Sequence, residues 1–386
     1  MKKLFFLFTL GLIVTSCEPD VIIDPIENKN KIVNSDITTN TTWYSDTVYQ
    51  LGGRISVENG ATLTIQPGTV IKGEAGTGSN ATALLVSRGS KIIAEGTPQL
   101  PIIFTSVADE LTPEMVSQGN FASPNLDPTI NGLWGGLIVL GNAKISASNT
   151  TGDVSSVQIE GIPTSDPNGL YGGNDDNDNS GIISYVSIRH GGANIGSGNE
   201  INGLTLGGVG RMTSVNNVEV VANQDDGIEW FGGTVNVSNV VVWNAGDDAI
   251  DTDQSWAGSL NNFVVINPAN HCFELDGPEG NYLAGHNISF GDIYVRGGHD
   301  LINVDENSIV NLSDLYFTDI QSNLSKINRT TAPGVTFTNI VLNVDNNIVG
   351  EYINGTLPQS SVVGGQIPKA NTSSLGWTWA SQSGEF

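Results

Sequence analysis

The stretch Asn217-Val218-Glu219-Val220 returns along the chain as Asn239-Val240-Val241-Val242 and as Asn262-Phe263-Val264-Val265. Its first apolar residue advances from 218 to 240 to 263, in steps of 22 and 23 residues. We expect the series to continue at Asp292-Ile293-Tyr294-Val295, Asp314-Leu315-Tyr316-Phe317 and Ile340. Such a period indicates a solenoid, because each coil can bury its inner face only against its neighbours.

A second pattern follows the first at a nearly fixed distance of ten residues, nine in its last copy. Its copies are Asp226-Gly227-Ile228-Glu229, Asp248-Ala249-Ile250-Asp251, His271-Cys272-Phe273-Glu274 and Asp300-Leu301-Ile302-Asn303. Two or three strands per coil predict an all-β fold, a single-stranded right-handed parallel β-helix with coils of about 22–25 residues. A β-sandwich array is the alternative. Stacked coils would place equivalent residues about 4.8 Å apart, so we expect asparagine ladders at the turns.

Composition limits the partners of the chain. Its 386 residues include 15 basic and 40 acidic side chains, which gives a net charge of −25. That charge excludes a nucleic-acid partner, because phosphate binding needs clustered Lys and Arg. Two cysteines cannot form a disulfide scaffold, and we expect Cys272 to be a small buried residue. We expect a monomer.

The N-terminal residues predict a targeting signal. Lys2 and Lys3 precede an apolar run over 4–14 that is too short to span a bilayer. We therefore expect a signal peptide over 1–16, whose end resembles the lipobox of bacterial lipoproteins. That resemblance implies a lipid on Cys17 and an anchor at the outer membrane or cell surface. An ordinary cleaved signal is the alternative.

The remaining chain divides into a polar tether and one large domain. We expect a lipidated tether over 17–36 and the parallel β-helix over 37–386. Loop insertions are expected near 106–131, 146–181 and 193–200. Trp377 and Trp379 in the C-terminal tail are expected to cap the last coil.

Several short stretches resemble a family of bacterial β-helix lipoproteins and secreted proteins that is common in Bacteroidota and lies within the pectate-lyase-like β-helix superfamily. They are Gly60-Ala61-Thr62-Leu63-Thr64-Ile65, Ala94-Glu95-Gly96-Thr97-Pro98, Trp134-Gly135-Gly136-Leu137-Ile138, Tyr171-Gly172-Gly173-Asn174-Asp175-Asp176, Ser187-Ile188-Arg189-His190-Gly191-Gly192, Asn199-Glu200-Ile201-Asn202-Gly203-Leu204, Asp225-Asp226-Gly227-Ile228-Glu229-Trp230-Phe231-Gly232-Gly233 and Gly376-Trp377-Thr378-Trp379. The resemblance implies the fold and no particular reaction.

An acidic stripe is the feature of the sequence best suited to ligand binding or catalysis. If the apolar residues of the second pattern point inward, alternation directs their neighbours outward. The two outer columns are Glu229, Asp251, Glu274 and Asn303, and Phe231, Asp253, Asp276 and Asp305. Like charges about 4.8 Å apart repel by roughly 0.9 kcal/mol in water and about 3.5 kcal/mol at a dielectric constant of 20. A solvated face tolerates the first value, whereas a recessed one needs raised carboxylate pKa values or a cation.

Three interpretations of the stripe remain open at this point. It is a solvated acidic face, a calcium-binding or sugar-binding surface, or a catalytic site. Calcium accepts 6–8 oxygen ligands in irregular geometry, which suits the carboxylates of Glu229, Asp251, Asp253, Glu274, Asp276 and Asp305. The acidic loop over 174–181 is a second metal candidate through Asp175, Asp176 and Asp178, although it lacks the glycine and glutamate of an EF-hand. A flexible acidic turn is the alternative there.

The catalytic interpretation rests on a likeness to β-helix pectinases, which carry acidic residues on one outer sheet. Its candidate residues are Asp225, Asp226, Asp247, Asp248, Asp251 and Glu274, with Arg296 as base and Arg189 and His299 as other basic candidates. Trp230, Trp243 and Trp256 are candidates for stacking on sugar rings or for packing. An enzyme also needs loops, such as 193–200 and 278–285, that wall the stripe.

We prefer a non-catalytic, surface-anchored β-helix whose acidic face binds a glycan, a cation or an envelope protein. A calcium-dependent polysaccharide lyase or glycosidase is the alternative, and a structural spacer without a ligand is the third.

Overall fold

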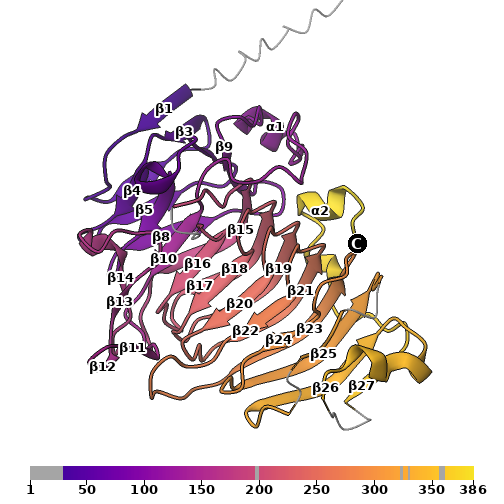
Figure 1. Cartoon of the computed structure of the whole chain (residues 1–386). Helices are drawn as coiled ribbons and strands as arrows, with labels where there is room; N and C mark the ends of the chain where they lie inside the picture. The colour runs from indigo at the N-terminus through magenta and orange to yellow at the C-terminus, as the bar shows by residue number, and fades with distance from the viewer. Residues whose placement is uncertain (1–28, 196–199, 322–324, 329–330, 356–360) are drawn as a thin grey trace, which may run out of the picture.

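The chain winds into a right-handed parallel β-helix, as predicted (Figure 1). The computed structural model describes residues 29–195, 200–321, 325–328, 331–355 and 361–386. One parallel sheet, here the long-strand sheet, contains β1 (Lys29–Val33), β2 (Thr41–Trp43), β3 (Thr47–Leu51), β5 (Thr62–Ile65), β6 (Val70–Gly73), β8 (Lys91–Glu95), β9 (Ile102–Ser106), β15 (Gly181–Arg189), β17 (Ser214–Val221), β19 (Asn236–Trp243), β21 (Ser259–Ile266), β23 (His286–Tyr294), β25 (Val310–Thr318), β26 (Val335–Leu342) and β27 (Val362–Gly364).

The short-strand sheet closes the other side of each coil. Its strands are β4 (Arg54–Val57), β7 (Ala83–Val86), β10 (Leu137–Leu140), β16 (Leu204–Gly207), β18 (Ile228–Phe231), β20 (Ile250–Asp253), β22 (Phe273–Leu275) and β24 (Asn303–Val304). The helical segments are short: α1 (Pro113–Ser117), α2 (Trp379–Gln382) and the 3-10 turns η1 (Gly78–Asn80), η2 (Pro167–Gly169), η3 (Asn346–Tyr352) and η4 (Thr372–Ser374). None of the helices in the described part of the chain is long and apolar enough to cross a membrane.

The predicted register holds wherever the coils are 22 or 23 residues long. Ile228 pairs with Ile250, and Ile250 with Phe273, in the short-strand sheet. Val218 likewise pairs with Val240, and Val240 with Phe263, in the long-strand sheet. All six side chains are buried in one core that runs along the solenoid.

The prediction for Ile293 is wrong by two residues. Phe263 pairs with Gly291 and not with Ile293, and Gly291 in turn pairs with Leu315. A Cβ on Gly291 would lie 2.2 Å from Cζ of Phe263, so the aromatic ring takes the space that a side chain would fill. A shift of two residues preserves the alternation of a strand, and the sequence pattern therefore does not distinguish the two registers.

A column of left-handed residues bends each long strand at the same place. Its members are Tyr185, Asn217, Asn239, Asn262, Phe290, Asp314 and Asn339, with φ between 51° and 61°. Asn and Asp tolerate this conformation, which explains the recurrent polar residue before the apolar one. The expected asparagine ladders are present: Asn262 Nδ2 donates to Asn239 Oδ1 at 2.7 Å, and Asn267 Nδ2 to Asn244 Oδ1 at 2.8 Å.

The solenoid begins earlier than predicted. β1 pairs with β3, so residues 29–33 belong to the first coil and not to the tether expected over 17–36. Only Val33 of this strand is buried, which is why its sequence looks like a linker. The insertion expected over 146–181 contains two antiparallel ribbons outside the main sheets, β11 (Ala147–Asn149) with β12 (Gly152–Val154) and β13 (Val157–Gln158) with β14 (Leu170–Tyr171).

The tryptophans considered for sugar stacking are buried. Trp230 and Trp256 stack on each other inside the core with ring centroids 4.7 Å apart. Trp243 lies outside the core but is covered by Trp379, whose ring centroid is 5.6 Å away. These three side chains therefore pack the protein and leave no face for a sugar.

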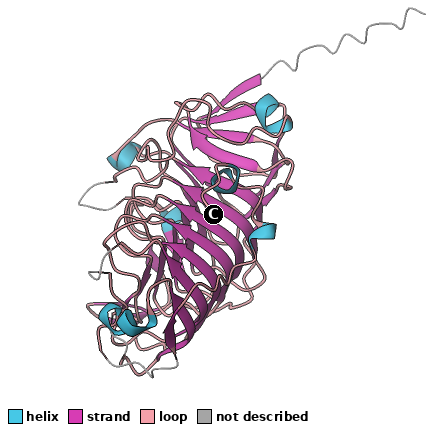
Figure 2. Cartoon of the chain, turned by 90° about the vertical axis from the view of Figure 1, so that its right-hand side faces the viewer, coloured by secondary structure: helices cyan, strands magenta, loops and turns pink. Residues whose placement is uncertain are grey.

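The C-terminal residues 366–386, here the strap, lie across the long-strand sheet and do not cap the last coil as expected (Figure 2). The first arm of the strap passes from Asp292, which accepts a hydrogen bond from Lys369 N at 2.6 Å, to Tyr185, whose ring meets that of Trp377. The second arm returns through α2 and ends with Glu385 paired to Arg296. Leu375, Trp379 and Ala380 pack on Val241, Trp243 and other apolar side chains that the middle coils direct outward.

Candidate functional site

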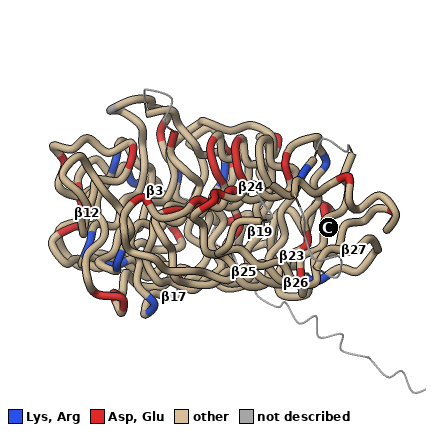
Figure 3. Tube along the Cα trace, turned by 60° about the horizontal axis from the view of Figure 1, so that its bottom comes forward, with Lys and Arg blue, Asp and Glu red and all other residues tan. Residues whose placement is uncertain are grey.

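The acidic stripe exists in the predicted order on the short-strand sheet. Glu229 pairs with Asp251, Asp251 with Glu274, and Glu274 with Asn303. In the second column Phe231 pairs with Asp253. The backbone hydrogen bonds from Asp276 N to Thr252 O and from Asp305 N to Leu275 O continue the same register. Figure 3 shows Asp and Glu recurring on neighbouring coils near β24.

The turn before each short strand adds a second set of carboxylates. Asp226 Oδ1 accepts a hydrogen bond from Asp248 N at 2.9 Å, and Asp248 Oδ1 accepts one from His271 N at 2.6 Å. Each of these aspartates therefore joins its own turn to the next coil, and both side chains are buried. Their neighbours Asp225 and Asp247 are only half-buried. The two Asp-Asp pairs thus divide into structural and accessible members.

Carboxylates from different coils converge where the turns meet the strands. In each of three groups, one ligand atom per residue lies within 4.8 Å of the others. The groups are Asp225, Asp226 and Asp247; Asp226, Glu229 and Asp251; and Asp248, His271 and Glu274. We call these eight residues the carboxylate cluster. Among the described residues, no Lys or Arg forms an ion pair with any of them.

The insertion loops bring further polar groups to the cluster that the sequence analysis missed. Asn202, next to the insertion expected over 193–200, is buried and donates from Nδ2 to Glu229 Oε2. Its Oδ1 is buried without a hydrogen-bond partner in the described part of the chain, as is Asp251 Oδ1. In the 278–285 loop, Glu279 accepts a hydrogen bond from Gln254 at 3.3 Å. The loops therefore reach the stripe, as a walled site requires.

Burial and crowding raise the pKa values of most of these carboxylates. Burial, with repulsion from Glu160 and Asp247, raises the pKa of Asp225 to about 7. The hydrogen bond to Asp248 and then burial raise the pKa of Glu274 to about 8. Burial also raises the pKa values of Glu229 and Asp251 well above their usual values, and it is the largest cause of both shifts.

Asp248 is the exception within the cluster. Burial works to raise its pKa, but hydrogen bonds to His271 and Glu274 outweigh burial and lower it. His271 Nδ1 lies 2.9 Å from Asp248 Oδ1. A lowered pKa on Asp248 beside a raised pKa on Glu274 is the kind of split that acid–base chemistry uses.

These shifts predict that folding takes up protons between about pH 4 and pH 8. A carboxyl group whose folded-state pKa is raised stabilises the fold below its unfolded pKa, and this stability is lost as pH rises through the folded value. His271, whose pKa is raised by Asp248 against the effect of burial, has the same sign. The lowered pKa of Asp248 affects stability only below pH 3.8, its usual value, where the stability that it contributes is lost as the pH falls. The metal-free protein should thus lose stability as pH rises, by about 1.4 kcal/mol per pH unit for each extra proton bound.

The other predicted site residues are engaged elsewhere. Asp176 contacts Lys144 at 3.3 Å and Arg211 at 3.8 Å, and Asp178 accepts hydrogen bonds from Asn142 and Ser180. The chain's own donors thus occupy the oxygens of the 174–181 loop, where Asp175 Oδ1 also accepts from Asn177 N.

The candidate base Arg296 does not serve the stripe. Its Nε lies 3.5 Å from Asp319 Oδ2 and its Nη2 donates to Glu385 O at 2.9 Å, so the end of the strap holds it. Arg189 is buried beside Glu219 on the long-strand sheet. His299 Nε2 lies 3.6 Å from the sulfur of Cys272, which is buried as expected.

Comparison with known proteins concerns the same part of the chain. A family model described as "Pectate-lyase like beta helix domain" matches residues 35–294, which is more than half of the 386 residues and contains the whole carboxylate cluster. Searches of curated proteins and of solved structures give no match.

Proposed function

Because the chain belongs to the pectate-lyase-like β-helix family, we propose that it is a lipid-anchored, non-catalytic β-helix whose carboxylate cluster binds calcium and whose acidic face engages glycans or envelope proteins through that ion. The observation that carries the proposal is the group of Asp226, Glu229 and Asp251, whose oxygens lie within 4.8 Å of one another. Three buried or half-buried carboxylates without a basic partner among the described residues need either protons or a cation.

The donor set of this group fits calcium. All its donors are oxygens, which hard cations prefer, and calcium tolerates the irregular geometry that a repeat imposes. Asn202 Oδ1, buried and without a partner, offers a neutral oxygen beside Glu229. Asp225 and Asp247 are half-buried at the edge of the cluster, where a cation could meet a ligand outside the protein. Calcium would neutralise charge here, and the proposal gives it no catalytic step.

Calcium should raise the melting temperature of the protein, and more at pH 8 than at pH 5, because protons compete for the same oxygens. Without calcium, the melting temperature should instead decrease as the pH rises from 5 to 8. The double variant Glu229→Gln, Asp251→Asn should remove the response to calcium. It should also stabilise the calcium-free protein in chelator at pH 8, because it removes the repulsion between neighbouring carboxylates. Thermal unfolding with millimolar calcium or chelator measures all four conditions.

Asp314→Asn is the matched control. It removes one carboxylate in the column of left-handed residues, where Asn is the usual residue, and should leave the calcium response intact. An unchanged melting temperature on adding calcium to the wild type would contradict the cation site. Release of products from an acidic or neutral glycan, lost in Glu274→Gln, would overturn the non-catalytic part, because Asp248 and Glu274 already have the pKa split of an acid–base pair.

The anchor is supported by the sequence alone, since Cys17 and the signal peptide expected over 1–16 lie outside the described residues. An apolar run that ends in small residues followed by cysteine is what lipidation requires. In a host that lipidates such signals, the protein should take up an alkyne-tagged fatty acid and Cys17→Ser should not. Equal labelling of both proteins would exclude an anchor on this residue.

A further inference from the structure

A second cavity lies on the other side of the solenoid from the carboxylate cluster. It has a volume of about 370 Å³ and is lined by Gln99, Phe121, Tyr185, Ser374, Trp377 and Gln382, together with Pro98, Ser373 and Gly376. The strap forms one wall and the coil of β15 the other. None of the described residues that line it is charged. In a chain with a net charge of −25, this lining selects a neutral occupant.

Tyr185 holds an unfavourable backbone conformation at this cavity. Its φ is 51°, in a column where five of the seven members are Asn or Asp. A bulky side chain in the left-handed region costs on the order of 1–2 kcal/mol. The conformation directs the ring outward to meet Trp377 at 5.6 Å between centroids and 71° between planes.

Trp377 carries a hydrogen-bond donor with no acceptor. The side chain is 5% exposed, and its Nε1 has no hydrogen-bond partner among the described residues. A buried Trp N–H normally finds an acceptor, and leaving it without one destabilises the fold by about 1–3 kcal/mol. An oxygen atom of a ligand in the cavity that Trp377 lines would satisfy this group.

We infer that this cavity binds a neutral saccharide. A sugar ring has apolar C–H faces that pack on an aromatic ring such as that of the half-buried Tyr185, and hydroxyl groups that need partners at its edge. Gln99, Gln382 and Ser374 supply amide and hydroxyl groups able to both donate and accept, without a charge to desolvate. The site is separate from the carboxylate cluster and needs no cation.

The structure supplies a variant that separates binding from folding. Tyr185→Asn installs the residue that the same column uses at 217, 239 and 262, so it relieves the backbone strain at this position while it removes the ring. We expect titration calorimetry of the full chain with methyl β-D-glucopyranoside, methyl α-D-mannopyranoside and their neutral trisaccharides to show binding of at least one probe. Tyr185→Asn should weaken it at least tenfold, and Gln382→Ala severalfold.

Phe290→Asn is the control for this test. Phe290 is the other aromatic member of the column, with φ of 61° and 45% exposure, and it does not line the cavity. This variant should leave sugar binding unchanged, and a chelator should too, which separates this site from the calcium proposal. Absence of binding for every probe at 10 mM, or equal binding by the wild type and Tyr185→Asn, would overturn the inference.

Discussion

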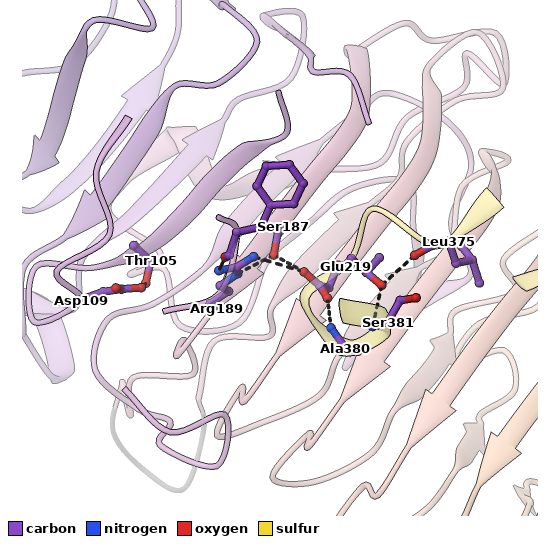
Figure 4. A network of polar contacts seen from close by, with 10 residues as sticks. Thr105, Asp109, Ser187, Arg189, Glu219, Leu375, Ala380 and Ser381 are labelled. Atoms are coloured by element: carbon purple, nitrogen blue, oxygen red, sulfur yellow. Dashed lines mark hydrogen bonds and ion pairs between the residues drawn. The ribbon is translucent and has the colours of Figure 1, made fainter. Parts of the chain in front are cut away.

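Glu219→Ala should lower the free energy of unfolding by about 3–5 kcal/mol, because it leaves the guanidinium of Arg189 buried without its counter-charge. Arg189 and Glu219 are 1% and 0% exposed, and Arg189 Nη2 lies 3.5 Å from Glu219 Oε2. Ser187 Oγ bridges them, donating to Glu219 at 2.6 Å and accepting from Arg189 Nε at 2.7 Å (Figure 4). Glu219 Oε1 also accepts from Ala380 N in the strap at 3.0 Å. Urea denaturation of both proteins measures the difference.

Asp319→Ala is the matched control for this prediction. It removes a carboxylate from Arg296, but Asp319 is 48% exposed and the contact is solvated. An exposed pair of this kind contributes about 0–1 kcal/mol. If both variants lose the same stability, the Arg189–Glu219 pair is not buried as described. The double variant Arg189→Met, Glu219→Leu should recover much of the loss, because it removes both charges together.

Removal of the strap should have the second large effect. A chain that ends at Gly365 would uncover Val241, Trp243, Val264 and Ile266, which pack against Leu375, Trp379 and Ala380. Each apolar side chain of this size contributes about 1.5–3 kcal/mol when buried. We therefore expect the melting temperature to fall by on the order of 10 °C and the protein to bind a hydrophobic dye.

Gln382→Ala, on the exposed side of α2, should leave both the melting temperature and dye binding at wild-type values. Trp379→Ala should lie between the control and the truncation, since Trp379 contacts Trp243 and lies 4.9 Å from Arg189 Cζ. A truncated chain that melts like the wild type would show that the strap does not cover these residues in solution.

The fold was predictable because the repeat concerns the residues that form the core. Val218, Val240 and Phe263 recur at almost constant spacing, and each is buried directly above the one before. The pattern failed at Ile293, because a longer loop precedes this strand. A shift of two residues also leaves the same set of side chains facing the core. It also failed for the strap, because contacts between residues 375–380 and the middle coils leave no periodic signal.

The site was predictable in position and not in environment. Strand alternation placed Glu229, Asp251 and Glu274 on one outer column, and the structure confirms that register. Their surroundings include Asn202, 27 residues before Glu229, and Glu279, which bonds Gln254 from 25 residues away, and no local pattern reports such contacts. The partners of Arg296 and Arg189 were missed for the same reason, since Glu385 and Glu219 lie 89 and 30 residues away.

The strap also fixes how many coils the middle of the molecule contains. Its first arm is attached at Asp292 on β23 and at Tyr185 on β15, and β17, β19 and β21 lie between these points. Duplication or loss of one coil there would move the two attachment points by about 4.8 Å relative to each other, and a segment of unchanged length could not reach both. Solenoids commonly change length by whole repeats during evolution, whereas the strap fixes the number of coils in the central part of this one. Whole coils can be gained or lost without this constraint only where the strap does not cross them.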